Sequence, residues 1–217
     1  MDAIAILGGS GRQGRGLAER FSAAGLHVVV GSRDPERAGA ALAASAHGSR
    51  LEVVDNATAV ERCDVTVLAV PFASVDGLLS DLRDRFRERS IVIDLTVPVL
   101  FTGGTMSMAE VAEGSASEHI RALLPPHVQL AAAFKTIPAD LLATPGAPLD
   151  CDEFVCADSD EARARAMELV ALLPGLRPVD AGPLRRARHI EHLTALAIAI
   201  NRRHKIHGAR FRLVGLP

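Results

Sequence analysis

The chain has 217 residues, of which 48% are hydrophobic and 23% charged, and its formal net charge is −2 at pH 7. This balance is typical of a soluble globular protein and offers no electrostatic basis for binding nucleic acid or a membrane surface. The chain contains no Trp or Tyr and only 7 Phe, which argues against a protein that stacks single-stranded bases.

The cysteines indicate a reducing compartment. Cys63, Cys151 and Cys156 show no CxxC or other metal-ligand spacing, so we expect no metal site. Their odd number, without a recognisable signal peptide, is typical of a protein outside the secretory route. No apolar run is long enough to span a membrane. We therefore expect a cytoplasmic protein.

The first forty residues predict a strand, a glycine turn, a helix and a second strand. An apolar run over 3–7 leads into a glycine-rich turn, and a helix over 15–24 and a strand over 27–30 follow. The turn matches the G-x-G-x-x-G fingerprint of dinucleotide-binding domains. We expect Gly9 to permit the tight turn and Gly11 to let the backbone approach a pyrophosphate. Gly14 should let the helix pack close to the strand. Ser10, Arg12 and Gln13 complete the predicted phosphate site at the helix N-terminus.

The end of the second strand favours NADP over NAD. NAD-binding domains usually carry an acidic residue there, whereas this chain has Ser32 and Arg33. A hydroxyl and a guanidinium suit a 2′-phosphate. We expect Asp34 to cap the next helix, with Pro35 at its first position. Arg37, one turn further on, is either a second phosphate contact or an ordinary solvated arginine.

Alternating helices and strands continue to residue 95. We expect helices over 35–46, 57–62 and 72–89, and strands over 51–54, 65–70 and 91–95. This pattern predicts a Rossmann-type α/β fold with a doubly wound parallel sheet. Ligands bind beyond the carboxyl ends of such strands, so the predicted crevice includes Val70, Pro71 and Pro98.

The remaining chain predicts a smaller α/β extension. We expect a loop over 102–105, a helical turn over 106–113, and a helix that begins with a capping box at 115–118. Strands follow over 128–134, 153–157 and 177–180, with helices over 138–143, 160–173 and 186–204. The predicted division is an NADP-binding core over 1–126 and a C-terminal portion over 127–217, packed together as one compact unit.

Several segments together resemble one family. GGSGRQGRGLA, VLAVPF, FKTIPADLLA and LRPVDAGPL are similar to the NADPH-dependent reductases of the 5-deazaflavin coenzyme F420, over nearly the whole chain. The resemblance implies a homodimer that binds NADP(H) and the deazaflavin face to face and passes a hydride between them. The family's phosphate-contacting residues fall on Ser10, Ser32 and Arg33.

The resemblance also implies where the deazaflavin binds. It places this substrate near Phe134, Lys135, Thr136 and Pro138, and near His192 and Thr194 at the last helix. The family commonly has a histidine at the position of Lys135 and a small hydroxyl residue at that of His192, so a different acceptor stays open.

Reduction leaves negative charge on the deazaflavin, and Lys135 and Thr136 are the predicted groups that stabilise it. The alternative for Lys135 is a solvated lysine at a strand end. Two rival functions also stay open. One is an NADP-dependent reductase of a small carbonyl or imine, and the other is a non-enzymatic NADP sensor.

Overall fold

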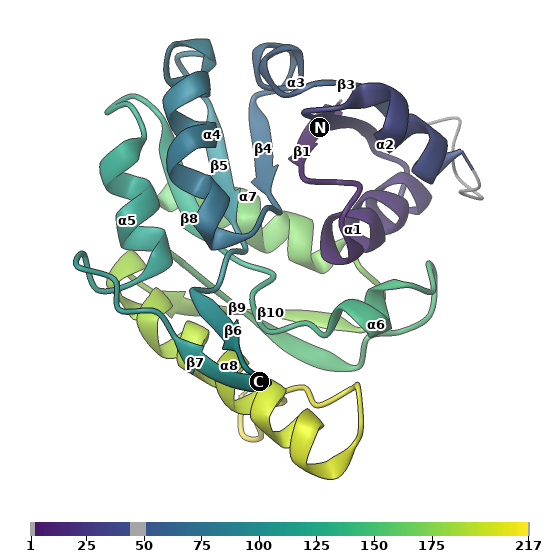
Figure 1. The fold of residues 1–217 in the computed structure, drawn as a ribbon, viewed down its shortest axis with the longest axis vertical. Helices are drawn as coiled ribbons and strands as arrows, with labels where there is room; N and C mark the ends of the chain where they lie inside the picture. Colours follow the sequence, from purple (N-terminus) through teal and green to yellow (C-terminus); the bar gives the residue numbers. More distant parts are fainter. Residues whose placement is uncertain (1–2, 44–50, 217) are drawn as a thin grey trace.

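An eight-stranded sheet runs through the whole molecule (Figure 1). The computed structural model describes residues 3–43 and 51–216. The strand order is β10-β9-β8-β5-β4-β1-β2-β3. Six neighbouring strands are parallel: β1 (Ala3–Leu7), β2 (His27–Ser32), β3 (Leu51–Asp55), β4 (Val65–Leu68), β5 (Ile91–Asp94) and β8 (Gln129–Ala132). The Rossmann-type α/β prediction is confirmed.

The last two strands reverse direction. β9 (Cys151–Ala157) pairs antiparallel with β8, and β10 (Leu176–Gly182) pairs parallel with β9. The sheet is therefore mostly parallel, and residues beyond 126 extend it from the β5 edge with β8, β9 and β10. No helix in the described ranges is long and apolar enough to cross a membrane.

Helices cover both faces of the sheet because its strands bury alternate residues on opposite sides. On one face, Ile4 and Ile6 belong to a core with α1 (Arg12–Ala23), α2 (Pro35–Leu42) and α7 (Asp160–Ala171). On the other, Ala5 and Leu7 belong to a second core with α3 (Asn56–Arg62), α4 (Val75–Leu82), α5 (Ala116–Leu123) and α8 (Ala187–His204). The result is a three-layer sandwich.

The strand order reverses between β1 and β4. From β1 the sheet continues to β2 and β3 on one side, and to β4, β5 and β8 on the other. The loops that leave β1 and β4 therefore diverge, and a crevice opens at the carboxyl ends of these strands. This topology fixes the position of the site.

Two predicted helix starts are confirmed. The Asp34 carboxylate accepts a hydrogen bond from the Arg37 backbone N–H at 3.0 Å, and Pro35 stands at the first position of α2. Ser115 accepts from the Glu118 N–H at 3.1 Å and so caps α5, while the Glu118 carboxylate accepts from the Ser115 hydroxyl at 2.7 Å and not from the backbone N–H of a full capping box. α2 ends at Leu42, and residues 44–46 of the longer predicted helix lie outside the described residues.

The helical turn predicted over 106–113 is wrong. Residues Val99–Thr102 (β6) and Thr105–Met108 (β7) form an antiparallel hairpin beside α8 (Figure 1). Gly103 and Gly104 have φ of +56° and +79°, the two left-handed conformations that a tight type I′ hairpin turn requires. The Gly-Gly pair is thus a turn signal and ends the preceding strand.

The single helix predicted over 72–89 is also wrong. The segment consists of a 3₁₀ turn at Phe72–Ser74, then α4, then a second 3₁₀ turn at Arg83–Arg85. Phe86 is extended and almost fully buried in the second core, so the chain stops being helical there. α6 (Ala139–Leu142) is a single turn that packs on α1.

Candidate active site

The glycine turn between β1 and α1 is built around three close backbone approaches. Gly8, and not Gly9 as predicted, has the left-handed conformation that turns the chain out of β1 (φ +81°). Gly9 is required for another reason, because a Cβ there would lie 2.7 Å from Val30 Cγ1. A Cβ on Gly14 would lie 2.4 Å from the Gly8 carbonyl oxygen, so this glycine lets the helix pack on the turn that follows β1, where packing on the strand itself was predicted.

The N-terminus of α1 is open to an anion. Its N-cap residue, Gly11, has no capping side chain, and its first turn contains no acidic residue. Four other helices, α2, α3, α5 and α7, are each capped by a side-chain oxygen, whereas α4, α6 and α8 resemble α1 in having none but do not follow the glycine turn. The unpaired N–H groups and the helix dipole of α1 therefore fit the pyrophosphate of a dinucleotide.

The predicted 2′-phosphate residues lie at the end of β2. The Ser32 hydroxyl accepts from the Asp34 N–H at 3.1 Å, which shapes the turn into α2. Arg33 and Arg37 are exposed, and neither forms an ion pair in the part of the chain that the structure describes. Both guanidinium groups are thus available to a phosphate outside the main cavity.

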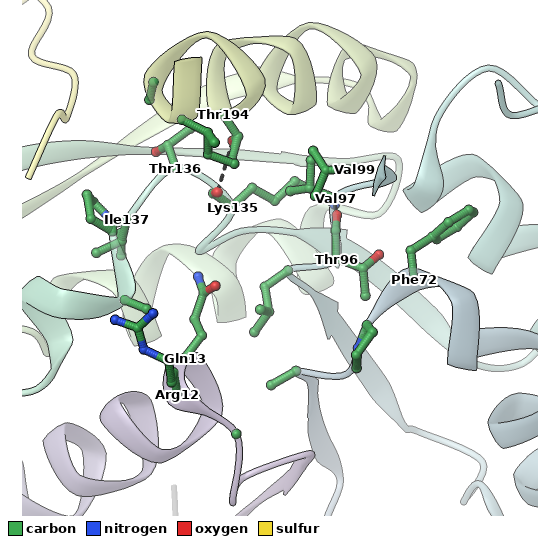
Figure 2. A pocket seen from close by; sticks show the side chains of 18 of the residues that line it. Arg12, Gln13, Phe72, Thr96, Val97, Val99, Lys135, Thr136, Ile137 and Thr194 are labelled. Atoms are coloured by element: carbon green, nitrogen blue, oxygen red, sulfur yellow. Dashed lines mark hydrogen bonds between the residues drawn. The ribbon is translucent and has the colours of Figure 1, made fainter. Parts of the chain in front are cut away.

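A cavity of about 500 Å³ lies at the carboxyl edge of the sheet, between α1 and α8. Figure 2 shows Arg12 and Gln13 of α1 on one side and Thr194 of α8 on the other. Segments 69–72, 95–97 and 135–139 form the walls between them. Predicted site residues that line this cavity are Gly11, Arg12, Gln13, Val70, Pro71, Lys135, Thr136, Pro138 and Thr194. The structure therefore brings the nucleotide turn and the predicted second-substrate residues to one space.

Other predicted residues lie outside the cavity lining. They are Gly9, Ser10, Gly14, Ser32, Arg33, Arg37, Pro98, Phe134 and His192. Most of these belong to the glycine turn or to the end of β2. His192 is exposed, and its Nδ1 lies 2.6 Å from the Arg188 carbonyl oxygen, within its own helix.

Phe134 turns the chain into the cavity wall. It has a left-handed conformation (φ +59°), which is uncommon for a residue with a side chain, and its ring is fully buried against Phe21. Its carbonyl oxygen accepts a hydrogen bond from Gln13 Nε2 at 2.8 Å. This bond ties the wall directly to the start of α1.

The Lys135 side chain is buried, so the alternative of a solvated lysine is wrong. Its ammonium lies 2.7 Å from Asp94 Oδ2 and 3.3 Å from Glu191 Oε1, and it also donates to the Thr96 carbonyl oxygen at 2.5 Å. The Lys135 carbonyl oxygen accepts from Thr194 Oγ1 at 2.9 Å (Figure 2). The lysine thus connects the loop after β5, the cavity wall and α8.

The wall continues into a segment that Arg20 holds in place. Arg20 is 2% exposed, and its guanidinium donates to four backbone carbonyl oxygens, those of Leu141, Leu142, Thr144 and Ala147. Gly16 lets α1 approach α6, because a Cβ there would lie 2.5 Å from Leu142 Cβ. At the rim, Arg12 pairs with Asp140.

Sequence reasoning missed most of the α8 wall. Ala197, Ile198 and Asn201 line the cavity beside Thr194, and the Asn201 side chain accepts from the Ala209 N–H at 2.9 Å, which brings Ala209 into the lining. Positions 194, 197, 198 and 201 follow helical spacing, so they form one face. The helical spacing from Thr194 could therefore have predicted the other three positions from the sequence.

Comparisons with known proteins identify the family of the chain. Residues 3–98 match the family described as NADP oxidoreductase coenzyme F420-dependent. The chain is 37% identical to the F420-dependent NADP reductase of Methanothermobacter thermautotrophicus strain Delta H, over 99% of this chain and 95% of the relative. The chain belongs to the F420-dependent NADP reductase family.

Solved structures give the same fold. A crystal structure from Arthrobacter sp. FB24, of a protein described as a candidate F420-dependent NADP reductase, has a TM-score of 0.83 and 24% identity, over 97% of this chain and 98% of that one. An imine reductase from Myxococcus stipitatus has a TM-score of 0.59 and 18% identity, over 94% of this chain but only 61% of its own. The shared fold includes the sheet and its switch point.

Proposed function

We propose that this protein passes a hydride between NADP(H) and coenzyme F420. The observation that carries the proposal is that one cavity has the open N-terminus of α1 at one end and the face of α8 at the other. Family membership supplies the two substrates, because the relative that matches the whole chain is named an F420-dependent NADP reductase.

The residues divide into an NADP part and a deazaflavin part. The α1 N-terminus, with Gly9, Ser10, Gly11, Arg12, Gln13 and Gly14, would hold the pyrophosphate. Ser32 and Arg33, with Arg37 as a second contact, would hold the 2′-phosphate. Val70, Pro71 and Pro98 would lie beside the nicotinamide. The deazaflavin would bind against Lys135, Thr136, Pro138 and Thr194, whereas Phe134, buried behind the wall, and His192, exposed on α8, lie outside the cavity.

Hydride transfer depends mainly on how the protein positions the two coenzymes. When bound, the two coenzymes supply the hydride donor and acceptor, and the protein has to hold them in contact and exclude water. The cavity suits this task because much of its wall is apolar, including Val70, Leu95, Val97 and Ile198. Lys135 and Thr136 remain our candidates for positioning the acceptor, but the Lys135 ammonium is paired with Asp94 and Glu191 and the Thr136 hydroxyl donates to Glu153, so neither supplies a free charge.

The test combines the purified protein with oxidised F420 and either NADPH or NADH. We expect rapid loss of the deazaflavin visible absorbance with NADPH and little loss with NADH. Tight NADPH binding without any loss of absorbance would contradict the proposal.

The same experiment separates the rival functions. An NADP-dependent imine or carbonyl reductase would consume NADPH only with a small substrate of that class, and the fold shared with imine reductases favours this rival among the alternatives. A sensor would bind NADPH without turnover. The relatives that align over nearly their whole length are named F420-dependent NADP reductases, which argues against the first rival.

We further infer a cytoplasmic homodimer. Cys63, Cys151 and Cys156 are free and buried, as suits a reducing compartment. The hairpin and α8 expose large apolar side chains, among them Phe101 and Leu196, as a subunit contact would require. Light scattering after size-exclusion chromatography tests the oligomeric state.

A further inference from the structure

Glu153 is a fully buried carboxyl group directly behind the cavity wall. It lies in the middle of β9, on the sheet face of Cys151 and Val155, and has no exposed surface. Its Oε1 accepts from the Lys135 backbone N–H at 2.9 Å, and its Oε2 accepts from Thr136 Oγ1 at 2.8 Å. Both donors belong to segment 135–139, which lines the cavity and is called the wall below.

We propose that Glu153 is a positioning residue for the second substrate: its ionised carboxylate fixes the wall at Lys135 and Thr136, and protonation loosens that wall. This inference rests on the proposed function, in which the wall contacts the deazaflavin. The NADP end of the cavity lies on α1 and the loops after β1 and β4, and Gln13 joins it to the Phe134 carbonyl and not to Glu153, so NADPH binding should depend on Glu153 much less.

The wall needs such an anchor because it follows an unfavourable turn. Phe134 is left-handed, and the next residues leave the sheet. Three bonds hold this turn: Gln13 to the Phe134 carbonyl, Glu153 to the Lys135 N–H, and Thr194 to the Lys135 carbonyl. Among these three partners only Glu153 can ionise, so pH acts on the turn through it.

The environment of Glu153 sets the pH range. Burial raises the pKa of Glu153 to about 7, although the hydrogen bonds from Thr136 and Lys135 and the positive charge of Lys135 oppose this rise. The Lys135 ammonium is paired with Asp94 and Glu191. Burial also raises the pKa of the Cys151 thiol, on the same strand, to about 11, so this thiol is neutral near pH 7.

The charged groups that interact with Cys151 include two guanidinium groups. They belong to Arg20 of α1 and Arg210 of the C-terminal segment. Arginine stays charged throughout the neutral range, and the Cys151 thiol titrates well above it. Burial also raises the pKa of Glu191, which pairs with the Lys135 ammonium, so the Glu153→Gln variant is needed to assign a change of the wall near pH 7 to Glu153.

The direction of the effect follows from the hydrogen bonds. Above pH 7 the carboxylate accepts from both donors, and the wall is fixed. Below pH 7 one oxygen carries a proton and competes with the Thr136 hydroxyl as donor, so the charge-assisted bonds are lost. We expect the KM for F420 to rise about tenfold as the pH falls from 8 to 5.5. A factor of this size corresponds to the free energy of one such hydrogen bond. The Kd for NADPH should change less than about twofold, since no bond to its site is lost.

The first test needs no substrate. NMR would follow the backbone amide signals of Lys135 and Thr136 between pH 5 and pH 9 in the wild-type protein and in Glu153→Gln. We expect both signals to shift with a shared midpoint near 7 in the wild-type protein only. Wild-type signals that stay constant over this range, or the same shifts in Glu153→Gln, would overturn the inference, whatever the protein catalyses.

The second test compares three variants in the F420 assay. Glu153→Gln should raise the KM for F420 about tenfold at pH 8 and abolish its pH dependence, because the neutral amide mimics the protonated acid. Glu153→Asp should keep the pH dependence. Asp152→Asn is the matched control, because this neighbouring carboxylate on β9 pairs with Arg177, away from the cavity.

The outcomes separate the two claims. A wild-type protein that does not turn over F420 would contradict the proposed function, while the amide titration would still decide whether Glu153 controls the wall. A wild-type protein that turns over F420 with a KM independent of pH would overturn only the inference about Glu153. So would equal effects of Glu153→Gln and Asp152→Asn.

Discussion

Lys135 Nζ and Asp94 Oδ2 lie 2.7 Å apart, and neither side chain has any exposed surface. Burial alone would favour the neutral amine, but the carboxylates of Asp94 and Glu191 outweigh it and raise the pKa of Lys135. The lysine therefore stays charged. Ser117 Oγ donates to the same Asp94 oxygen at 2.6 Å, so this ion cluster also holds the start of α5.

Replacing this lysine should cost stability. Lys135→Met keeps an unbranched side chain one atom shorter but leaves Asp94 and Glu191 buried without their cation. We expect the free energy of unfolding to fall by about 3–5 kcal/mol, measured by denaturant titration. Arg85→Met, which breaks the exposed pair with Glu61, is the control and should have a much smaller effect. Equal losses in the two variants would contradict a structural role for the buried pair.

Cofactor preference should depend on Arg33. Arg33→Glu places a carboxylate beside the 2′-phosphate, so we expect the Kd for NADPH to rise at least about tenfold while the Kd for NADH falls or stays constant. Titration of each nucleotide by its fluorescence measures both values. Arg37→Glu, made in parallel, tests the second phosphate contact. An unchanged Kd for NADPH in Arg33→Glu would remove Arg33 from the site.

Gly14 should be intolerant of any side chain. In Gly14→Ala the new methyl group would meet the Gly8 carbonyl oxygen at 2.4 Å, so α1 has to move away from the turn. We expect weaker NADPH binding and a lower melting temperature. Gly77→Ala is the matched control in α4, because nothing lies within 4 Å of its added methyl. That variant should gain about 0.5–1 kcal/mol of stability from the lower entropy of its unfolded chain.

The contribution of Glu153 to the free energy of unfolding should fall as the pH rises toward neutrality. Burial raises the pKa of Glu153 from its ordinary value of 4.5 to about 7. Between these values the folded state binds more protons than the unfolded state, so the free energy of unfolding decreases with pH. The loss contributed by Glu153 is on the order of 3 kcal/mol, complete above pH 7. Unfolding curves of wild type and Glu153→Gln at pH 5 and pH 7.5 measure it; parallel pH dependences would rule out a raised pKa at Glu153.

Local patterns predicted the nucleotide half of the molecule well. The alternation of strands and helices fixed the Rossmann-type sheet, and Asp34 and Ser115 cap their helices as their positions indicated. Such signals act over a few residues, so they are readable without knowledge of the fold. The glycine fingerprint was found for the same reason, although the left-handed turn lies at Gly8.

Long-range partners could not be predicted. Lys135 is buried because Asp94 and Glu191, 41 and 56 residues away in sequence, neutralise its charge; no local pattern indicates such a pairing. The same holds for Glu153, whose partners come from the neighbouring strand's extension. The β6–β7 hairpin was missed although its Gly-Gly turn was visible, because the flanking strands are only four residues long.

The most direct measurement of the central claim traces the hydride itself. Purified protein would be mixed with oxidised F420 and NADPH that carries deuterium at the transferring C4 position, and the reduced coenzyme analysed by mass spectrometry and NMR. We predict one deuterium on the deazaflavin ring carbon that accepts the hydride, with no exchange with solvent, and a primary isotope effect on the single-turnover rate. Reduced F420 without deuterium at that carbon, or NADPH that stays unoxidised, would contradict direct transfer in this cavity.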